Sequence, residues 1–187
     1  ETLSEIELHL LSGSIDAVYD VALELARNQA LPPLLLSKAE RGYRLFRNTP
    51  PRPERAGEVD IRAVETPLAG FRRIALDCLA HLQSNHSGAI LGEDPEYVHQ
   101  MRVATRRLRA ALRMFRPALP PGIEDALVPP LRELMRGLGQ ARDLDVLVAE
   151  IVSPVSRAIP DDPRLTDLAS AITNRQYAAR NAIRHML

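Results

Sequence analysis

Apolar residues recur every three or four positions along most of the chain after residue 66. This period is that of an amphipathic helix, and it predicts helices at residues 67–84, 95–116, 122–138, 140–153 and 164–186. The expected breaks contain glycine or proline and lie at Gly88 and Gly92, Pro117 with residues 120–122, Gly137 with Gly139, and residues 154–163. Connections this short favour antiparallel neighbours, so the pattern predicts a mainly α fold built as an antiparallel helical bundle.

The first 47 residues follow another pattern. Apolar and polar residues alternate over residues 4–10, which predicts a strand, and residues 15–28 have the period of an amphipathic helix. A second strand is expected within residues 34–46, so residues 1–47 are predicted to form a short β-α-β segment. Residues 48–59 are polar and rich in proline, which predicts a linker to a helical domain at 60–187. The chain begins at Glu1 within the alternating pattern, and we expect it to be part of a longer protein.

The composition fits a folded chain in a reducing compartment. With 187 residues, 45% hydrophobic and 26% charged, the chain can bury a core of its own. Cys78 is the only cysteine, so no internal disulfide forms, and a cytoplasmic location is expected. No apolar run approaches the roughly 20 residues that span a bilayer, so no membrane partner is expected.

The basic residues are nearly all arginine and are unevenly placed. The formal net charge is zero, with 24 basic and 24 acidic residues, and Lys38 is the only lysine. Between Tyr97 and Ile123 there are six arginines and no acid. A guanidinium matches phosphate oxygens with two parallel hydrogen bonds, which a lysine cannot do. This clustering indicates a local site for a polyanion despite the neutral total.

One face of the helix expected at 95–116 carries most of these arginines. The spacings of 3, 4, 3 and 4 place five side chains within an arc of about 80°, and we call this set the arginine stripe: His99, Arg102, Arg106, Arg109 and Arg113. The apolar side chains form a separate stripe: Met101, Ala104, Leu108, Ala111, Leu112 and Phe115. At a rise of about 1.5 Å per residue the arginine stripe is about 20 Å long, so a linear polyanion could lie along it.

Other interpretations of this stripe remain open from the residues alone. Most charged helical faces are solvated surface, and the arginines could instead pair with acids of a partner in a helical interaction scaffold. His99 has no ligand at the third or fourth following position, so no metal site and no cofactor are expected. No nucleophile accompanies it, so no catalytic residue is expected. Aromatic residues make up only 4% of the chain, which weighs against nucleic acid as the partner.

Two motifs resemble the signatures of the CHAD family, the conserved-histidine α-helical domain. The first is VHQMRVATRRLR at residues 98–109 and the second is LGQARDLDV at residues 138–146. The resemblance covers residues 60–187 and implies an all-helical fold of two four-helix halves around a basic channel that binds inorganic polyphosphate without catalysis. By match to the motifs it assigns this binding to His99, Arg102, Arg106, Arg107, Arg109 and Arg142.

Three details qualify this assignment. Arg107 points away from the arginine stripe, so we rank it below the others, and Arg113 enters on spacing alone. Asp143 and Asp145 are expected to cap a helix or orient an arginine rather than bind metal. The chain ends after the first half of the expected fold. An open half-bundle would expose an apolar face, so a homodimer that completes the bundle is expected.

The start of the chain resembles the closing part of a CYTH domain, the triphosphate tunnel fold. The resemblance rests on SEIEL at residues 4–8 and SKAERGY at residues 37–43. The strand with the family's E-x-E-x-K motif is absent from this sequence, so residues 1–47 are interpreted as a remnant, with Glu5 and Glu7 on a solvated strand face. An accessory role in a CYTH-type triphosphate hydrolase is the alternative function. Association with polyphosphate granules would fit the favoured one.

Overall fold

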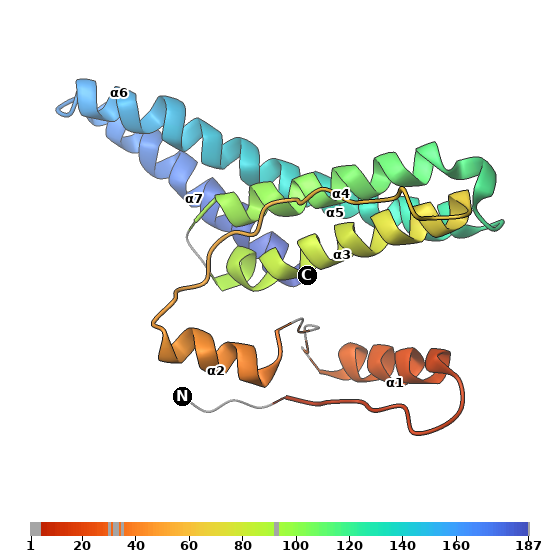
Figure 1. The fold of residues 1–187 in the computed structure, drawn as a ribbon. Coiled ribbons are helices and arrows are strands. Elements are labelled where there is room, and N and C mark those ends of the chain that lie inside the picture. The colour runs from red at the N-terminus through yellow and green to blue at the C-terminus, as the bar shows by residue number, and fades with distance from the viewer. Residues whose placement is uncertain (1–4, 30, 32–33, 35, 92–93, 187) are drawn as a thin grey trace. The chain divides into compact units, whose positions relative to one another are not determined.

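The computed structural model describes residues 5–29, 31, 34, 36–91 and 94–186, and all regular structure in them is helical (Figure 1). The prediction of a mainly α fold is therefore confirmed. Contacts between residues divide the chain into two compact units, 1–34 and 35–187. The predicted domains at 1–47, 48–59 and 60–187 stay a prediction.

In its described residues the first unit contains one helix, α1 (Ile15–Asn28), at the predicted position. Ser14 caps it, because the side-chain oxygen accepts a hydrogen bond from the backbone N–H of Asp16 at 3.1 Å. The strand predicted at residues 4–10 is wrong for the described residues 5–10, which form no regular structure; Ser4 lies outside the described residues. Alternation alone does not make a strand, which needs a partner for its backbone groups.

The second predicted strand, within residues 34–46, is also wrong, because α2 (Lys38–Phe46) is a helix. Ser37 accepts a hydrogen bond from the backbone N–H of Glu40 at 3.2 Å, the first half of a capping box. Glu40 then forms an ion pair with Arg44 one turn later, at 3.0 Å. These local signals start a helix, so residues 5–46 contain no β-α-β segment in their described part.

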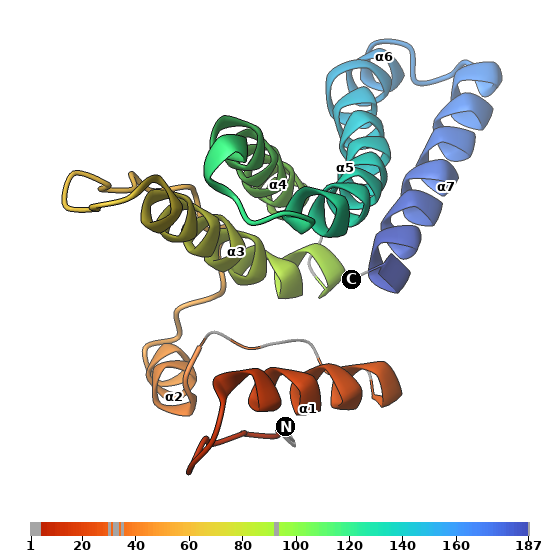
Figure 2. The same ribbon diagram turned by 90° about the vertical axis from the view of Figure 1, so that its right-hand side faces the viewer.

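The second unit is built mainly from four long helices, α3 (Pro67–Leu91), α4 (Glu96–Met114), α5 (Ile123–Leu147) and α7 (Pro163–Met186). Three shorter helices lie between them: η1 (Arg116–Ala118), η2 (Val148–Val152) and α6 (Ser153–Ala158). Each long helix runs antiparallel to the one before it (Figures 1 and 2). Helix α3 packs on α4, α4 on α5, and α5 on α7.

Two apolar clusters hold these helices together. Met101 of α4 packs with Leu138 of α5 and Ile183 of α7 in the first cluster. Leu112 of α4 packs with Phe71 of α3 in the second. The predicted apolar stripe of α4 is confirmed, since all its members except the half-buried Phe115 are buried: Met101, Ala104, Leu108, Ala111 and Leu112. Burying this stripe turns the arginine stripe away from the α3 side of the core.

Three glycines that the sequence predicted as helix breaks lie inside helices instead, whereas Gly92 lies outside the described residues. Helix α3 continues through Gly88 to Leu91, and α5 runs through Gly137 and Gly139 to Leu147. The glycines instead admit close neighbours. The ring of Tyr97 occupies the place of a Cβ at Gly88. A Cβ at Gly137 would lie 2.6 Å from Cε of Met186, and one at Gly139 would lie 3.0 Å from Nη1 of Arg102.

Candidate functional site

A groove of about 430 Å³ lies between the second half of α4 and the start of α5. We call it the arginine groove, and its lining consists of Arg106, Arg109, Ala110, Leu112, Arg113, Arg116, Glu124 and Val128. The structure therefore brings three residues of the arginine stripe together at one concave surface. Its floor is partly apolar, because Leu112 and Val128 also belong to the core or pack against it.

The three arginines that α4 contributes to this groove form no ion pair with any described residue. Within the described part of the chain, Arg106, Arg109 and Arg113 take part in no hydrogen bond or ion pair of their side chains. Arg106 and Arg113 are exposed and Arg109 is half-buried. Neighbouring guanidiniums on one helical face repel one another by a few tenths of a kcal/mol per pair, so an anion that binds between them relieves this repulsion.

Two charged residues of the groove, Arg116 and Glu124, were not predicted from the sequence. Arg116 lies beyond α4, in η1, and Glu124 lies in the first turn of α5. Nε of Arg116 is 2.7 Å from Oε2 of Glu124, so the two charges neutralise each other. Helical spacing could not find this pair, because the turn between the two helices determines where Arg116 points.

Arg102 and Arg142 lie farther along the same interface between α4 and α5. Nη1 of Arg102 is 3.9 Å from Oδ1 of Asp143, a weak ion pair beside Gly139. Arg142 follows Gly139 by three positions, so the two residues lie on the same face of α5, and Arg142 is half-buried. His99 is half-buried one turn before Arg102. His99 and Arg102 continue the arginine stripe of α4 beyond the groove, whereas Arg142 belongs to α5, and none of the three lines the groove.

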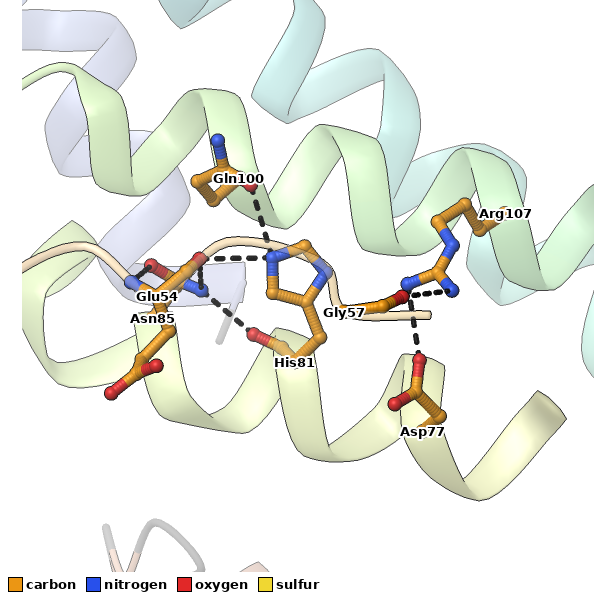
Figure 3. A network of polar contacts seen from close by, with 7 residues as sticks. All are labelled: Glu54, Gly57, Asp77, His81, Asn85, Gln100 and Arg107. Carbon is orange, nitrogen blue, oxygen red and sulfur yellow. Dashed lines mark hydrogen bonds and ion pairs between the residues drawn. The ribbon is translucent and has the colours of Figure 1, made fainter. Parts of the chain in front are cut away.

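Arg107 faces the other way, as the helical geometry predicted. Its Nη1 lies 3.1 Å from Oδ2 of Asp77 on α3, and its Nη2 donates a hydrogen bond of 3.4 Å to the carbonyl oxygen of Gly57 (Figure 3). The charge of Arg107 is therefore neutralised within the protein, unlike that of Arg106, Arg109 and Arg113.

Two arginines of α7, Arg180 and Arg184, hold helices together rather than line the groove. Arg180 donates a hydrogen bond of 3.0 Å to the buried carboxylate of Asp145, which also accepts one of 2.7 Å from Gln176. Arg184 donates one of 2.6 Å to the carbonyl oxygen of Ile90. Asp145 thus orients an arginine, as expected, although that arginine lies on another helix.

The described residues hold no cluster of three or more histidine, cysteine, aspartate or glutamate side chains that could bind a metal ion. Among the helices in the described part of the chain, none is both long and apolar enough to cross a bilayer.

These helices and the arginine-bearing face of α4 define a helical-bundle module, and comparison with known proteins gives its family. The model of the CHAD domain matches residues 73–187, so the chain belongs to the CHAD family. The crystal structure of the CHAD domain from the plant Ricinus communis is similar, with 35% sequence identity and a TM-score of 0.58. That similarity covers 73% of this chain and 45% of the plant chain, so the present chain spans less than half of the plant chain's length. No curated protein matches. Neither match shows the CYTH relationship expected for residues 1–47.

Proposed function

We propose that this chain binds inorganic polyphosphate, without catalysing a reaction, at the arginine groove. The observation that carries the proposal is the set of three guanidiniums, on Arg106, Arg109 and Arg113, that share one groove and lack any acidic partner in the described chain. His99, Arg102 and Arg142 would extend the track along the interface of α4 and α5. We assign Arg107 the weakest share in binding, since Asp77 already neutralises it.

The physical argument rests on charge and shape. Arginine forks bind phosphate oxygens with charge-assisted hydrogen bonds. Leu112 and Val128 give the groove a partly apolar lining, and attraction between charges is stronger beside apolar groups than in bulk water. A groove of about 430 Å³ suits a thin, flexible phosphate chain better than a rigid duplex, whose phosphates lie on a wide cylinder.

The groove's lining also favours binding over catalysis. Among the described residues it contains no serine, cysteine or histidine that could act as a nucleophile or base, and the acid present, Glu124, is paired with Arg116. We accordingly propose a binding module, located in the cytoplasm and associated with polyphosphate granules. A second copy that completes the bundle is supported by apolar side chains that remain exposed on η2 and α7, namely Ile151, Leu168 and Tyr177.

The test is a titration with labelled long-chain polyphosphate at two salt concentrations, with duplex DNA as competitor. We expect polyphosphate binding to weaken as salt rises, because salt ions screen or replace the contacts. We also expect that duplex DNA at an equal phosphate concentration does not displace the bound polyphosphate. Displacement by duplex DNA at equal phosphate concentration would refute the preference for a thin chain. The absence of polyphosphate binding at low salt would refute the proposed function.

A further inference from the structure

Residues 53–57, within the segment predicted to be a linker, are held in the seam between α3 and α4 by a buried side chain. The backbone N–H of Glu54 donates a hydrogen bond of 3.0 Å to Oδ1 of Asn85, and Nδ2 of Asn85 donates one of 3.0 Å to the carbonyl oxygen of Glu54 (Figure 3). Asn85 thereby satisfies both backbone groups of one residue, as a neighbouring strand would. Asn85 is fully buried, so an interior side chain of α3 holds the exposed residue Glu54 against the helix. We call residues 53–57 the strap.

A second set of contacts connects the strap to α4. Nε2 of His81 lies 3.0 Å from the carbonyl oxygen of Glu54 and 3.1 Å from Oε1 of Gln100. Gln100 donates its amide N–H to Glu96 at 2.7 Å, which fixes its oxygen toward His81. Since both neighbours of Nε2 are acceptors, this nitrogen carries the proton and donates to both. The strap, α3 and α4 therefore meet at one imidazole.

Arg107 makes the third connection, between the far end of the strap and α4. It donates to the carbonyl oxygen of Gly57 and pairs with Asp77 of α3. Arg107 directly follows Arg106 and precedes Arg109 by two positions, and both of those line the groove. The same stretch of α4 thus contacts the strap on one side and forms the arginine groove on the other.

We propose that the strap is an integral part of the phosphate-binding module and that Asn85, His81 and Arg107 are positioning residues for α4. The coupling to the ligand rests on the function proposed above. A docked strap holds α4 in the position that aligns the groove, and a bound polyphosphate favours the same position, so each strengthens the other. The CHAD match begins at residue 73, so the strap lies outside it.

The only cysteine of the chain reports on the strap. Cys78 lies on the face of α3 that also carries His81 and Asn85, and only 1% of it is exposed. Burial raises the pKa of its thiol, which slows its reaction further. Because modification requires an opened state, its rate measures how often the seam opens.

The experiment compares two substitutions of Glu54 in the full chain. Glu54→Pro removes the N–H that Asn85 accepts, whereas Glu54→Ala keeps it and serves as the matched control. With helicity by circular dichroism unchanged, we expect a thiol reagent to modify Cys78 at least about fivefold faster in Glu54→Pro, and at the wild-type rate in Glu54→Ala. Equal rates of Cys78 modification in the two variants would refute the proposal that the contact of Glu54 with Asn85 holds the strap in place.

The coupling is tested by adding saturating long-chain polyphosphate to the wild-type protein. We expect polyphosphate to slow the modification of Cys78 several-fold. We also expect Glu54→Pro to lower the affinity for polyphosphate by no more than the factor by which polyphosphate slows this modification, because the coupling is reciprocal. An unchanged rate at saturation would overturn the coupling while leaving the strap intact. Failure of the wild-type protein to bind polyphosphate would instead refute the proposed function and the coupling together, and the comparison without ligand would still decide whether the strap exists.

Discussion

Nε of Arg116 lies 2.7 Å from Oε2 of Glu124, so the acid that lines the arginine groove neutralises the groove arginine that does not belong to α4. As far as the described residues show, the groove therefore holds three unpaired guanidiniums, on Arg106, Arg109 and Arg113, and one internal ion pair. A phosphate chain that reaches Arg116 must compete with Glu124 for it.

The first prediction concerns this competition. Glu124→Gln removes a negative charge from the groove and releases Arg116, so polyphosphate affinity should rise about two- to fivefold, since exposed ion pairs are worth at most about 1 kcal/mol. Affinity is measured by titration at low salt. The control is Glu133→Gln, which makes the same charge change at an exposed position outside the groove. Equal gains in the two variants would mean that only net charge matters.

The second prediction separates two adjacent arginines. Arg106→Gln should weaken polyphosphate binding several-fold and leave thermal stability unchanged, because Arg106 is exposed and unpaired within the described chain. Arg107→Gln should lower the Tm by roughly 2–4 °C, since it loses about 1 kcal/mol of contacts with Asp77 and Gly57. Differential scanning calorimetry and titration of both variants give the comparison. A stability loss confined to Arg106→Gln would contradict these roles.

The third prediction concerns a glycine that permits close packing. Gly88→Ala should destabilise the protein by about 1–3 kcal/mol, because its Cβ would collide with the ring of Tyr97. Gly42→Ala, in the exposed helix α2, meets no neighbour within 4 Å and should cost nothing. Denaturant unfolding monitored by circular dichroism measures both. The packing argument fails if the two variants are equally stable.

The fourth prediction concerns the buried carboxylate between α5 and α7. Asp145→Ala removes the buried carboxylate that accepts hydrogen bonds from Arg180 and Gln176 and should cost about 2–4 kcal/mol of unfolding free energy. Asp143→Ala removes an exposed carboxylate 3.9 Å from Arg102 and should change stability by less than about 0.5 kcal/mol. Chemical denaturation gives both values. Similar losses of unfolding free energy in the two variants would show that the burial of Asp145 does not determine its contribution to stability.

Periodicity predicted the parts of this protein that depend on one helix alone. The bounds of α1 at residues 15–28 are as predicted, and the apolar stripe of α4 is buried as predicted. The alignment of Arg106, Arg109 and Arg113 on one face follows from the same period. These features need only the 3.6-residue repeat, which the sequence displays directly.

Features that depend on a second element were not predicted. Gly137 looked like a helix break, but its role is set by Met186, almost fifty residues away. The Arg116–Glu124 pair depends on the turn that joins α4 to α5. The contacts of Glu54 within the proline-rich segment were not predicted either, because their partners Asn85 and His81 lie about thirty residues downstream.

Charge reversal in the groove tests the central claim most directly. Polyphosphate binding by Arg109→Glu is compared with that of Arg157→Glu, which makes the same change at an exposed position on α6, outside the groove. The account predicts at least about a tenfold loss of affinity for Arg109→Glu, with helicity intact, and little change for Arg157→Glu. Equal losses in the two variants would contradict it, because binding would then depend on total charge and not on the arginine groove.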